Sequence, residues 1–436
     1  MMNRNRLMDK KTTRREFLVA SSALAAMSLL PRRLIGGLGA NEKIRVAHVG
    51  VGGMGESHLR WFAAFPDCET VALADVDQVR AAQKKELLGS LRPEVKVDTY
   101  SDFRDILDRS DIDVVTCATP DHWHAPVALA AFEAGKDVYG EKPLSYSVVE
   151  GRAMLAAQRK HKRVFQLGTQ IHAGDNYHRV VELVQSGVLG KIHTVRLWKT
   201  GGAPNLGWPR NETPPATLDW DMWLGPAPYI DYTPARCHFS YRYFFDFSGG
   251  VFADFWCHIA DVVFWALKPE GLTRVTARGE VPMDNIADTP LWIDADFDFK
   301  GLKLHWTTNP PDIEWAKGRS IGAYFEGTEG SLICDYGDRE ISIGGETFKD
   351  LPEVPQSIPR SPGHQRNFLD AVRSRGVPES NLEYARGMTL PMHLALISFR
   401  LKRELQWDSE RERFIGDPAA DYMLHRDYRS PWSLPL

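Results

Sequence analysis

The chain has 436 residues, of which 43% are hydrophobic and 25% are charged, and its formal net charge is −4. This length exceeds what one hydrophobic core usually serves, so we expect two domains with peripheral segments. The near balance of charge offers no electrostatic basis for binding nucleic acid or an anionic membrane surface. The five cysteines are scattered and form no Cys-x-x-Cys pair, so neither a disulfide framework nor a metal site is predicted.

The first forty residues are typical of an export signal. Basic residues lead into Thr13-Arg14-Arg15-Glu16-Phe17-Leu18, and an apolar run follows from Phe17 to Leu30. The paired arginines resemble a twin-arginine signal, and Leu38-Gly39-Ala40 offers small residues for cleavage before Asn41. We therefore expect residues 1–40 to be a signal peptide that directs the protein to the twin-arginine export machinery and to the periplasm. An ordinary secretory signal is the alternative.

Residues 41–167 alternate short β-rich runs with helical stretches. The predicted strands are Arg45–Val49, Thr70–Ala74, Lys96–Tyr100, Val114–Ala118, Asp137–Tyr139 and Val164–Leu167, and the predicted helices are Glu56–Phe65, Gln78–Leu88, Ala125–Ala134 and Ser147–His161. Such alternation requires parallel strands joined by right-handed crossovers. The sequence therefore predicts an α/β protein that begins with a Rossmann domain, which is a doubly wound parallel sheet.

A glycine-rich turn follows the first predicted strand and has the pattern G-x-G-x-x-G. Its residues are Gly50, Val51, Gly52, Gly53, Met54 and Gly55. Glycines permit the close approach of a pyrophosphate, and the following helix N-terminus favours its negative charge. Asp75 ends the second predicted strand twenty residues beyond Gly55, where a carboxylate accepts hydrogen bonds from ribose hydroxyls and repels a 2′-phosphate. We predict binding of NAD rather than NADP; for Asp75 a turn or helix-cap role is the alternative.

The pattern changes after Gly168. We predict helices at Tyr177–Gln185, Gly250–Leu267, Gly363–Ser374 and Leu382–Glu404, and strands at Ile192–Trp198, Arg274–Arg278, Leu291–Phe299, Leu302–Trp306, Ala323–Glu326 and Ser331–Asp335. Consecutive strands with short glycine-containing turns indicate a large, mostly antiparallel sheet. We expect residues 168–404 to form a substrate-binding and oligomerisation domain and residues 405–436 to form an extended C-terminal arm.

Three further motifs occur in order along the chain. They are Ala118-Thr119-Pro120-Asp121-His122-Trp123-His124, Ala134-Gly135-Lys136-Asp137-Val138-Tyr139-Gly140-Glu141-Lys142-Pro143 and Gly249-Gly250-Val251-Phe252-Ala253-Asp254-Phe255-Trp256-Cys257-His258. In this order and spacing they resemble the glucose–fructose oxidoreductase, inositol dehydrogenase and MocA-like family, over about residues 44–404. The resemblance implies a nicotinamide-dependent enzyme with an open-faced second sheet and an active site between its domains. A homodimer or homotetramer is expected by analogy.

The resemblance also implies roles for particular residues. Lys142 would touch both nicotinamide and substrate, while Asp254 and His258 would face the substrate from a helix. The remaining predicted contacts are Thr119, Pro120, His124 and Glu141 near the cofactor and Gln170 near the substrate. The Lys142–Pro143 bond is a candidate for the cis form.

Two features depart from the simplest family members. Thr169-Gln170 stands where an arginine-containing segment is common, and a long insertion contains Trp208, Trp220 and Trp223, followed by an aromatic cluster at Tyr241–Phe247. We therefore expect the substrate pocket to differ from that of inositol or glucose enzymes.

The proposed chemistry also follows from the residues themselves. Asp254 and His258 are four positions apart, so on a helix they share one face. Oxidation of an alcohol requires loss of the hydroxyl proton, for which histidine is a suited base, and the Lys142 ammonium stabilises a developing alkoxide. The alternative is a structural pair on a helix beside a surface Glu–Lys pair.

Three functions fit these residues. The first is oxidation or reduction of a sugar, cyclitol or sugar derivative. The second is a redox-neutral glycoside-cleaving or epimerising reaction, in which NAD oxidises a hydroxyl transiently. The third is a non-catalytic sugar-binding protein, which the presence of Lys142, Asp254 and His258 disfavours.

The export signal and the dinucleotide motif together imply a further expectation. No nicotinamide pool is expected outside the cytoplasm, so we expect the cofactor to be loaded before export and retained through slow dissociation.

Overall fold

The computed structural model describes residues 43–434. The predicted signal peptide and its cleavage site therefore lie outside the described residues.

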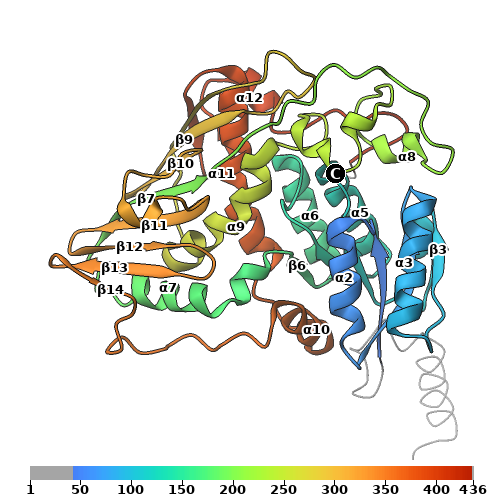
Figure 1. Ribbon diagram of the computed structural model, residues 1–436, viewed down its shortest axis with the longest axis horizontal. Helices are drawn as coiled ribbons and strands as arrows, with labels where there is room; N and C mark the ends of the chain where they lie inside the picture. The colour runs from blue at the N-terminus through green and yellow to red at the C-terminus, as the bar shows by residue number, and fades with distance from the viewer. Residues whose placement is uncertain (1–42, 435–436) are drawn as a thin grey trace, which may run out of the picture. The chain divides into compact units, whose positions relative to one another are not determined.

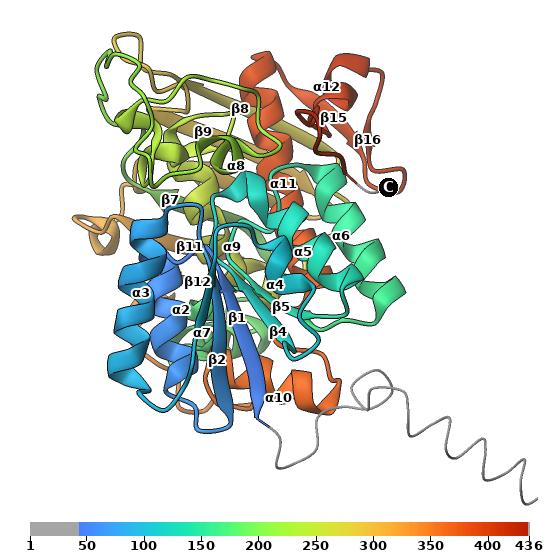
Figure 2. The same ribbon diagram turned by 90° about the vertical axis from the view of Figure 1, so that its right-hand side faces the viewer.

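The N-terminal part forms a six-stranded parallel sheet with the strand order β3-β2-β1-β4-β5-β6. Its strands are β1 (Ile44–Val49), β2 (Cys68–Ala74), β3 (Asp98–Tyr100), β4 (Val114–Cys117), β5 (Asp137–Gly140) and β6 (Phe165–Leu167). Its helices are α2 (Gly53–Ala63), α3 (Gln78–Leu91), α4 (Arg104–Leu107), α5 (His124–Glu133) and α6 (Val148–His161). Helices α2 and α3 lie on one face of the sheet and α5 and α6 on the other, which confirms the predicted doubly wound fold (Figure 2).

The second part is built on a ten-stranded sheet of order β14-β13-β12-β11-β7-β10-β9-β8-β15-β16. The strands are β7 (Ile192–Lys199), β8 (Arg274–Glu280), β9 (Trp292–Phe299), β10 (Leu302–Thr307), β11 (Ile321–Gly327), β12 (Gly330–Cys334), β13 (Arg339–Ile343), β14 (Glu346–Phe348), β15 (Leu405–Asp408) and β16 (Arg413–Phe414). Every pairing is antiparallel except that of β10 with β7. The prediction of a large, mostly antiparallel sheet is thereby confirmed.

Helices cover one face of this sheet. They are α7 (Asp175–Gln185), α9 (Gly250–Leu267) and α11 (Leu382–Leu401), with α10 (His364–Ser374) beside the N-terminal sheet (Figure 1). Strand β9 alternates half-buried and buried residues, and its apolar side packs against these helices. Helix α9 is long and apolar enough to cross a membrane, but 67% of it is buried, so it is the central core helix of the described chain.

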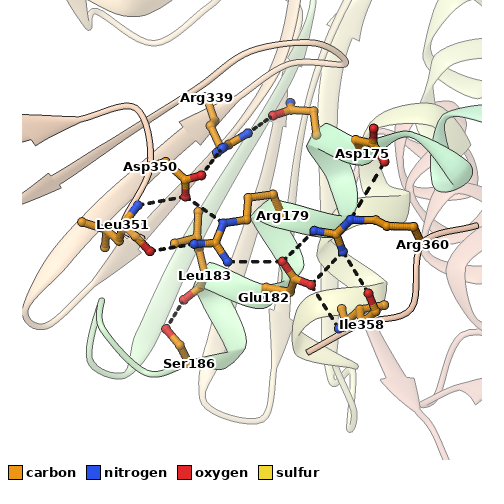
Figure 3. Close-up of polar contacts among 11 residues, drawn as sticks. Asp175, Arg179, Glu182, Leu183, Ser186, Arg339, Asp350, Leu351, Ile358 and Arg360 are labelled. Carbon is orange, nitrogen blue, oxygen red and sulfur yellow. Dashed lines mark hydrogen bonds and ion pairs between the residues drawn. The ribbon is translucent and has the colours of Figure 1, made fainter. Parts of the chain in front are cut away.

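An ion-pair network fixes α7 to the chain after β14 (Figure 3). The Glu182 carboxylate is fully buried and accepts hydrogen bonds from Arg360 (2.7 Å) and from the backbone N–H of Ile358 (3.0 Å). Arg179 lies 3.3 Å from Glu182 and donates to Asp350 (2.7 Å). The buried charges of Arg179 and Glu182 are thus both paired, and the network anchors α7 to the chain after β14. Its Tyr177 hydroxyl in turn donates to the carbonyl of His258 in α9 (3.0 Å).

Residues 200–249, which we call the strap, leave the second sheet and cross above the N-terminal sheet (Figures 1 and 2). The strap contains α8 (Trp220–Leu224) and the 3₁₀ helices η4 (Pro234–Arg236) and η5 (Ser240–Tyr243). Its predicted tryptophans Trp220 and Trp223 stack at 4.6 Å in a small core of their own. The backbone of Asp219 donates to Val76 (2.9 Å), which ties the strap to the end of β2.

The last segment after Glu404 contributes β15 and β16 to the sheet edge, followed by α12 (Pro418–Tyr422). After α12, residues 423–434 of the described chain lie outside helices and strands, as the predicted arm would. Strand formation here follows from pairing with β8, since Leu405 and Trp407 are buried and Gln406 between them is exposed.

Candidate active site

The glycine turn forms a cradle that only glycine permits. Gly50 has φ +76°, and a Cβ there would lie 2.8 Å from the backbone of Ala118. A Cβ on Gly55 would lie 2.1 Å from the carbonyl oxygen of Gly50. The turn therefore brings bare backbone to the N-terminus of α2, as a bound pyrophosphate requires. These residues fit a dinucleotide.

Asp75 lies immediately after β2 at the edge of this cradle. Its carboxylate accepts the backbone N–H groups of Val51 (2.8 Å) and Asp77 (2.9 Å). Burial raises the pKa of Asp75, and these backbone hydrogen bonds oppose that rise. These two hydrogen bonds fix the orientation of the carboxylate at the cleft. They also show Asp75 ordering the turn, which was the alternative to ribose binding.

A cleft of about 480 Å³ runs from Asp75 to Lys142. The predicted residues on its wall are Gly50, Gly52, Gly53, Met54, Asp75, Thr119, Pro120, Glu141 and Lys142. Val51 and Gly55 lie inside the turn rather than on the wall, since Val51 is fully buried and Gly55 packs on Gly50.

The strap supplies further residues of the cleft wall. Trp223, Tyr241 and Arg242 belong to segments that the sequence singled out as changing the pocket, whereas Met222, His238 and Phe239 were not predicted. His238 lies 3.0 Å from Asp77, and Tyr241 donates to the buried Asp121 (3.2 Å). Met222, His238 and Phe239 could not be predicted, because nothing in the sequence shows where a long insertion folds back.

Lys142 and Asp254 come from different halves of the structure and meet at the inner end of the cleft. Lys142 Nζ donates to the Asp254 carboxylate and to its backbone carbonyl (3.0 Å). Burial acts to lower the pKa of Lys142, but the charges of Asp254 and Glu141 raise it above its usual value. Burial acts to raise the pKa of Asp254, but the positive charges of Lys142 and Arg242 lower it to about 2. Both groups are therefore charged at neutral pH.

His258 lies one turn along α9 from Asp254, as predicted. Burial and the charge of Lys142 lower its pKa to about 4, so the imidazole is neutral at pH 7. Its Nδ1 is buried without a hydrogen-bond partner, and so is the hydroxyl of Tyr336, whose ring centroid lies 6.2 Å away. Buried polar atoms are rarely left unpaired, so these two are candidate partners for a polar group of a ligand. Tyr336 was not predicted, because it follows β12 far from every motif.

The loop that carries Lys142 is held in place by a buried histidine, His124. The Lys142–Pro143 bond is cis, as predicted. His124 contacts the carbonyl oxygens of Pro143 (2.6 Å) and Thr119 (3.0 Å) and does not line the cleft. Since both ring nitrogens face backbone carbonyls, His124 joins two loops in this structure, and its predicted cofactor contact stays a prediction.

Glu141 and Gln170 form a second buried layer. Glu141 contacts His58 (2.9 Å), and although burial acts to raise the pKa of Glu141, the His58 contact helps to lower it to about 2. Gln170 donates to Glu141 (3.0 Å) and to the Tyr139 hydroxyl (3.3 Å). A substrate contact by Gln170 stays a prediction.

A dinucleotide-binding parallel sheet joined to an open-faced α/β domain, with charged groups meeting at the inner end of the cleft, defines an NAD-binding oxidoreductase. Two family models agree. Residues 44–169 match "Oxidoreductase family, NAD-binding Rossmann fold", and residues 174–434 match "Oxidoreductase family, C-terminal alpha/beta domain". The chain belongs to the Gfo/Idh/MocA oxidoreductase family.

Similar proteins are known in sequence and structure. A glycosyl hydrolase family 109 protein of Shewanella sp. (strain MR-4) is 31% identical over 154 residues, which are 35% of this chain and 34% of that protein. This chain thus aligns with about a third of the length of that relative. A levoglucosan dehydrogenase complex with NADH and L-sorbose superposes with TM-score 0.62 at 21% identity, covering 84% of this chain and 99% of that one. An aldose-aldose oxidoreductase from Caulobacter crescentus gives TM-score 0.61 at 18% identity, with 84% and 100% covered. At these identities the structures show a shared fold.

Cofactor choice is tested by Asp75→Ala. Wild type is expected to bind NAD better than NADP, and the variant is expected to lose about tenfold or more in NAD affinity, since a hydrogen bond to a charged group contributes about 1.5–3 kcal/mol. NADP affinity should change less, because repulsion of the 2′-phosphate is relieved. Calorimetry with both nucleotides measures this, with the exposed Asp312→Ala as control. Equal wild-type affinities for the two nucleotides would contradict the assignment.

Proposed function

We propose that this protein is an exported, NAD-dependent oxidoreductase that acts on a hydroxyl-bearing carbon of a sugar, cyclitol or sugar derivative. The observation that supports this most directly is that Lys142, on the wall of the dinucleotide cleft, pairs with Asp254, which lies one helical turn from His258. The unpaired Nδ1 of His258 and the unpaired hydroxyl of Tyr336 suit a polyhydroxylated ligand.

The residues divide the proton chemistry between them. His258 is neutral and accepts the hydroxyl proton of the substrate as the alcohol is oxidised. The Lys142 ammonium stabilises the developing alkoxide, and Asp254 holds that ammonium in place. The bound nicotinamide supplies the site that takes or gives a hydride.

A redox-neutral glycoside-cleaving reaction is a second candidate. Its support is the name of the curated relatives, glycosyl hydrolase family 109 proteins, and of an alpha-N-acetylgalactosaminidase of Shewanella oneidensis that is 30% identical over 154 residues. The same three residues serve both reactions, since both begin by removing a hydroxyl proton.

Export and cofactor retention form part of the proposal. The leader sequence supports the twin-arginine route, which moves folded proteins, so the nucleotide would be bound before export. The strap supports retention, because it lies along the cleft and is tied to the turn after β2 at Val76 and Asp77.

One experiment tests this function. The mature chain from about Asn41 would be purified gently, analysed by mass spectrometry for bound nucleotide, and assayed with sugars and with nitrophenyl glycosides, with and without added NAD. We expect bound NAD(H) and turnover without added nucleotide. Release of nitrophenol from the glycosides would favour the redox-neutral reaction. Nucleotide-free protein that depends strictly on added NAD would overturn retention. Absence of turnover with every compound would favour the non-catalytic alternative.

A further inference from the structure

Three cationic side chains, those of Lys142, Arg242 and Lys199, lie near the single carboxylate of Asp254. Besides Lys142, the Nε of Arg242 lies 3.3 Å from Asp254 Oδ2. Lys199 at the end of β7 also feels the charge of Asp254 and lies with its Nζ 4.7 Å from the centroid of the Phe255 ring. Two further carboxylates lie near this group: Glu141, which His58 engages, and the buried Asp121, whose charge acts on Arg242. Lys199 is therefore the cation of the three that has no carboxylate within ion-pair distance in the described chain.

Arg242 is held in place chiefly by aromatic rings. Its guanidinium lies 4.5 Å from the Phe239 ring centroid and 4.7 Å from that of Tyr241, and Nη1 donates to the carbonyl of Phe239 (3.1 Å). Nε is buried against Asp254 and is therefore not available to a ligand, whereas Nη2 donates to no group within residues 43–434. A guanidinium held in place with a free Nη2 suits an anionic group such as a carboxylate.

Lys199 is available for the same purpose. Within the described chain its ammonium donates to the neighbouring carbonyl of Thr200 (2.8 Å) and has no carboxylate within ion-pair distance. Partial burial lowers the pKa of Lys199, which an added negative charge would reverse. Arg242 keeps Asp254 as its counter-charge with any sugar. A neutral sugar would leave Lys199 without one, whereas an acidic sugar would supply it.

We propose that the substrate is a carboxylate-bearing sugar, of the uronic or aldonic acid class, whose carboxylate is bound by Arg242 with Lys199 beside it. This inference rests on the proposed oxidoreductase function. Arg242 is then a specificity-determining residue, which pairs with Asp254 through Nε and binds the substrate carboxylate through Nη2.

The test compares matched neutral and acidic sugars. The full mature enzyme would be assayed with glucose, glucuronate and gluconate, with galactose and galacturonate, and with glucose 6-phosphate. The acids are expected to have the higher kcat/KM. Arg242→Gln should lower kcat/KM for the acids by about 10- to 150-fold, the value of a lost charged hydrogen bond of about 1.5–3 kcal/mol. It should lower kcat/KM for the neutral sugars by a smaller factor, since Arg242 also pairs with Asp254, so the ratio of acid to neutral kcat/KM falls. Lys199→Met should act in the same direction and more weakly, and the 80%-exposed Arg278→Gln should change nothing.

Binding measurements keep this inference separate from the proposed function. Thermal shift and NADH fluorescence would record binding of each sugar whether or not it reacts, so acid-selective binding that Arg242→Gln abolishes supports the inference even without turnover. Turnover confined to neutral sugars would overturn the inference and leave the oxidoreductase function intact. Preference for glucose 6-phosphate would overturn the carboxylate class. Weakened NADH binding by Arg242→Gln with unchanged sugar preference would assign Arg242 to the cofactor instead.

Discussion

Replacement of His258 by alanine is expected to lower turnover by roughly two to four orders of magnitude, the range usual for loss of a general base. NAD binding should change little, because the glycine turn and Asp75 lie at the other end of the cleft. The structural cost should also be small, since the Tyr177 hydroxyl bonds to the backbone carbonyl at position 258, which alanine keeps. Steady-state kinetics together with NADH fluorescence titration measure both quantities.

The pH profile of kcat/KM identifies the group that acts as the general base. In wild type the acid limb of kcat/KM is expected near pH 4, because the base must be unprotonated and the pKa of His258 is lowered to about 4. This limb should be absent in His258→Ala. His305→Ala is a matched control, since His305 pairs with Asp296 in strands far from the cleft. Turnover of His258→Ala within a few-fold of wild type at neutral pH would show that another group is the base.

Replacement of Lys142 by methionine is expected to lower kcat by about two to three orders of magnitude, comparable to removal of one oxyanion-stabilising donor. KM should rise as well, because Asp254 then keeps only Arg242 as a partner and turns toward it. The methionine side chain keeps the unbranched stem of lysine, so packing beside Pro143 is largely retained. Stopped-flow measurement of NADH formation separates the chemical step from substrate binding.

Lys349→Met, at a side chain that is 62% exposed, is the control for loss of one positive charge. If Lys142→Met raised KM alone and left kcat unchanged, Lys142 would bind the substrate without stabilising the transition state. Full activity of Lys142→Met would reject the site.

The sequence by itself determined the N-terminal sheet and its nucleotide turn. Local rules suffice there. Strand–helix alternation allows only right-handed crossovers between parallel strands, and the positive φ at position 50 requires glycine. The helix that carries Asp254 and His258 was also predictable with its bounds at Gly250–Leu267, since a mostly apolar segment of that length buries itself in the core. The pairing of these two residues on one face follows from helical periodicity alone.

Only the tertiary structure decided what surrounds them. Lys142 and Asp254 are 112 positions apart, and no periodicity relates a loop of one domain to a helix of another. Tyr336 and Arg242 reach the site because the sheet and the strap fold back on the cleft, which depends on long-range packing. The surroundings of His124 also depend on the fold, which places its two ring nitrogens against the carbonyls of Pro143 and Thr119, contacts that its motif did not indicate. The packed chain decides which polar groups remain free for a ligand, because a group that has a hydrogen-bond partner nearby in the fold bonds to it.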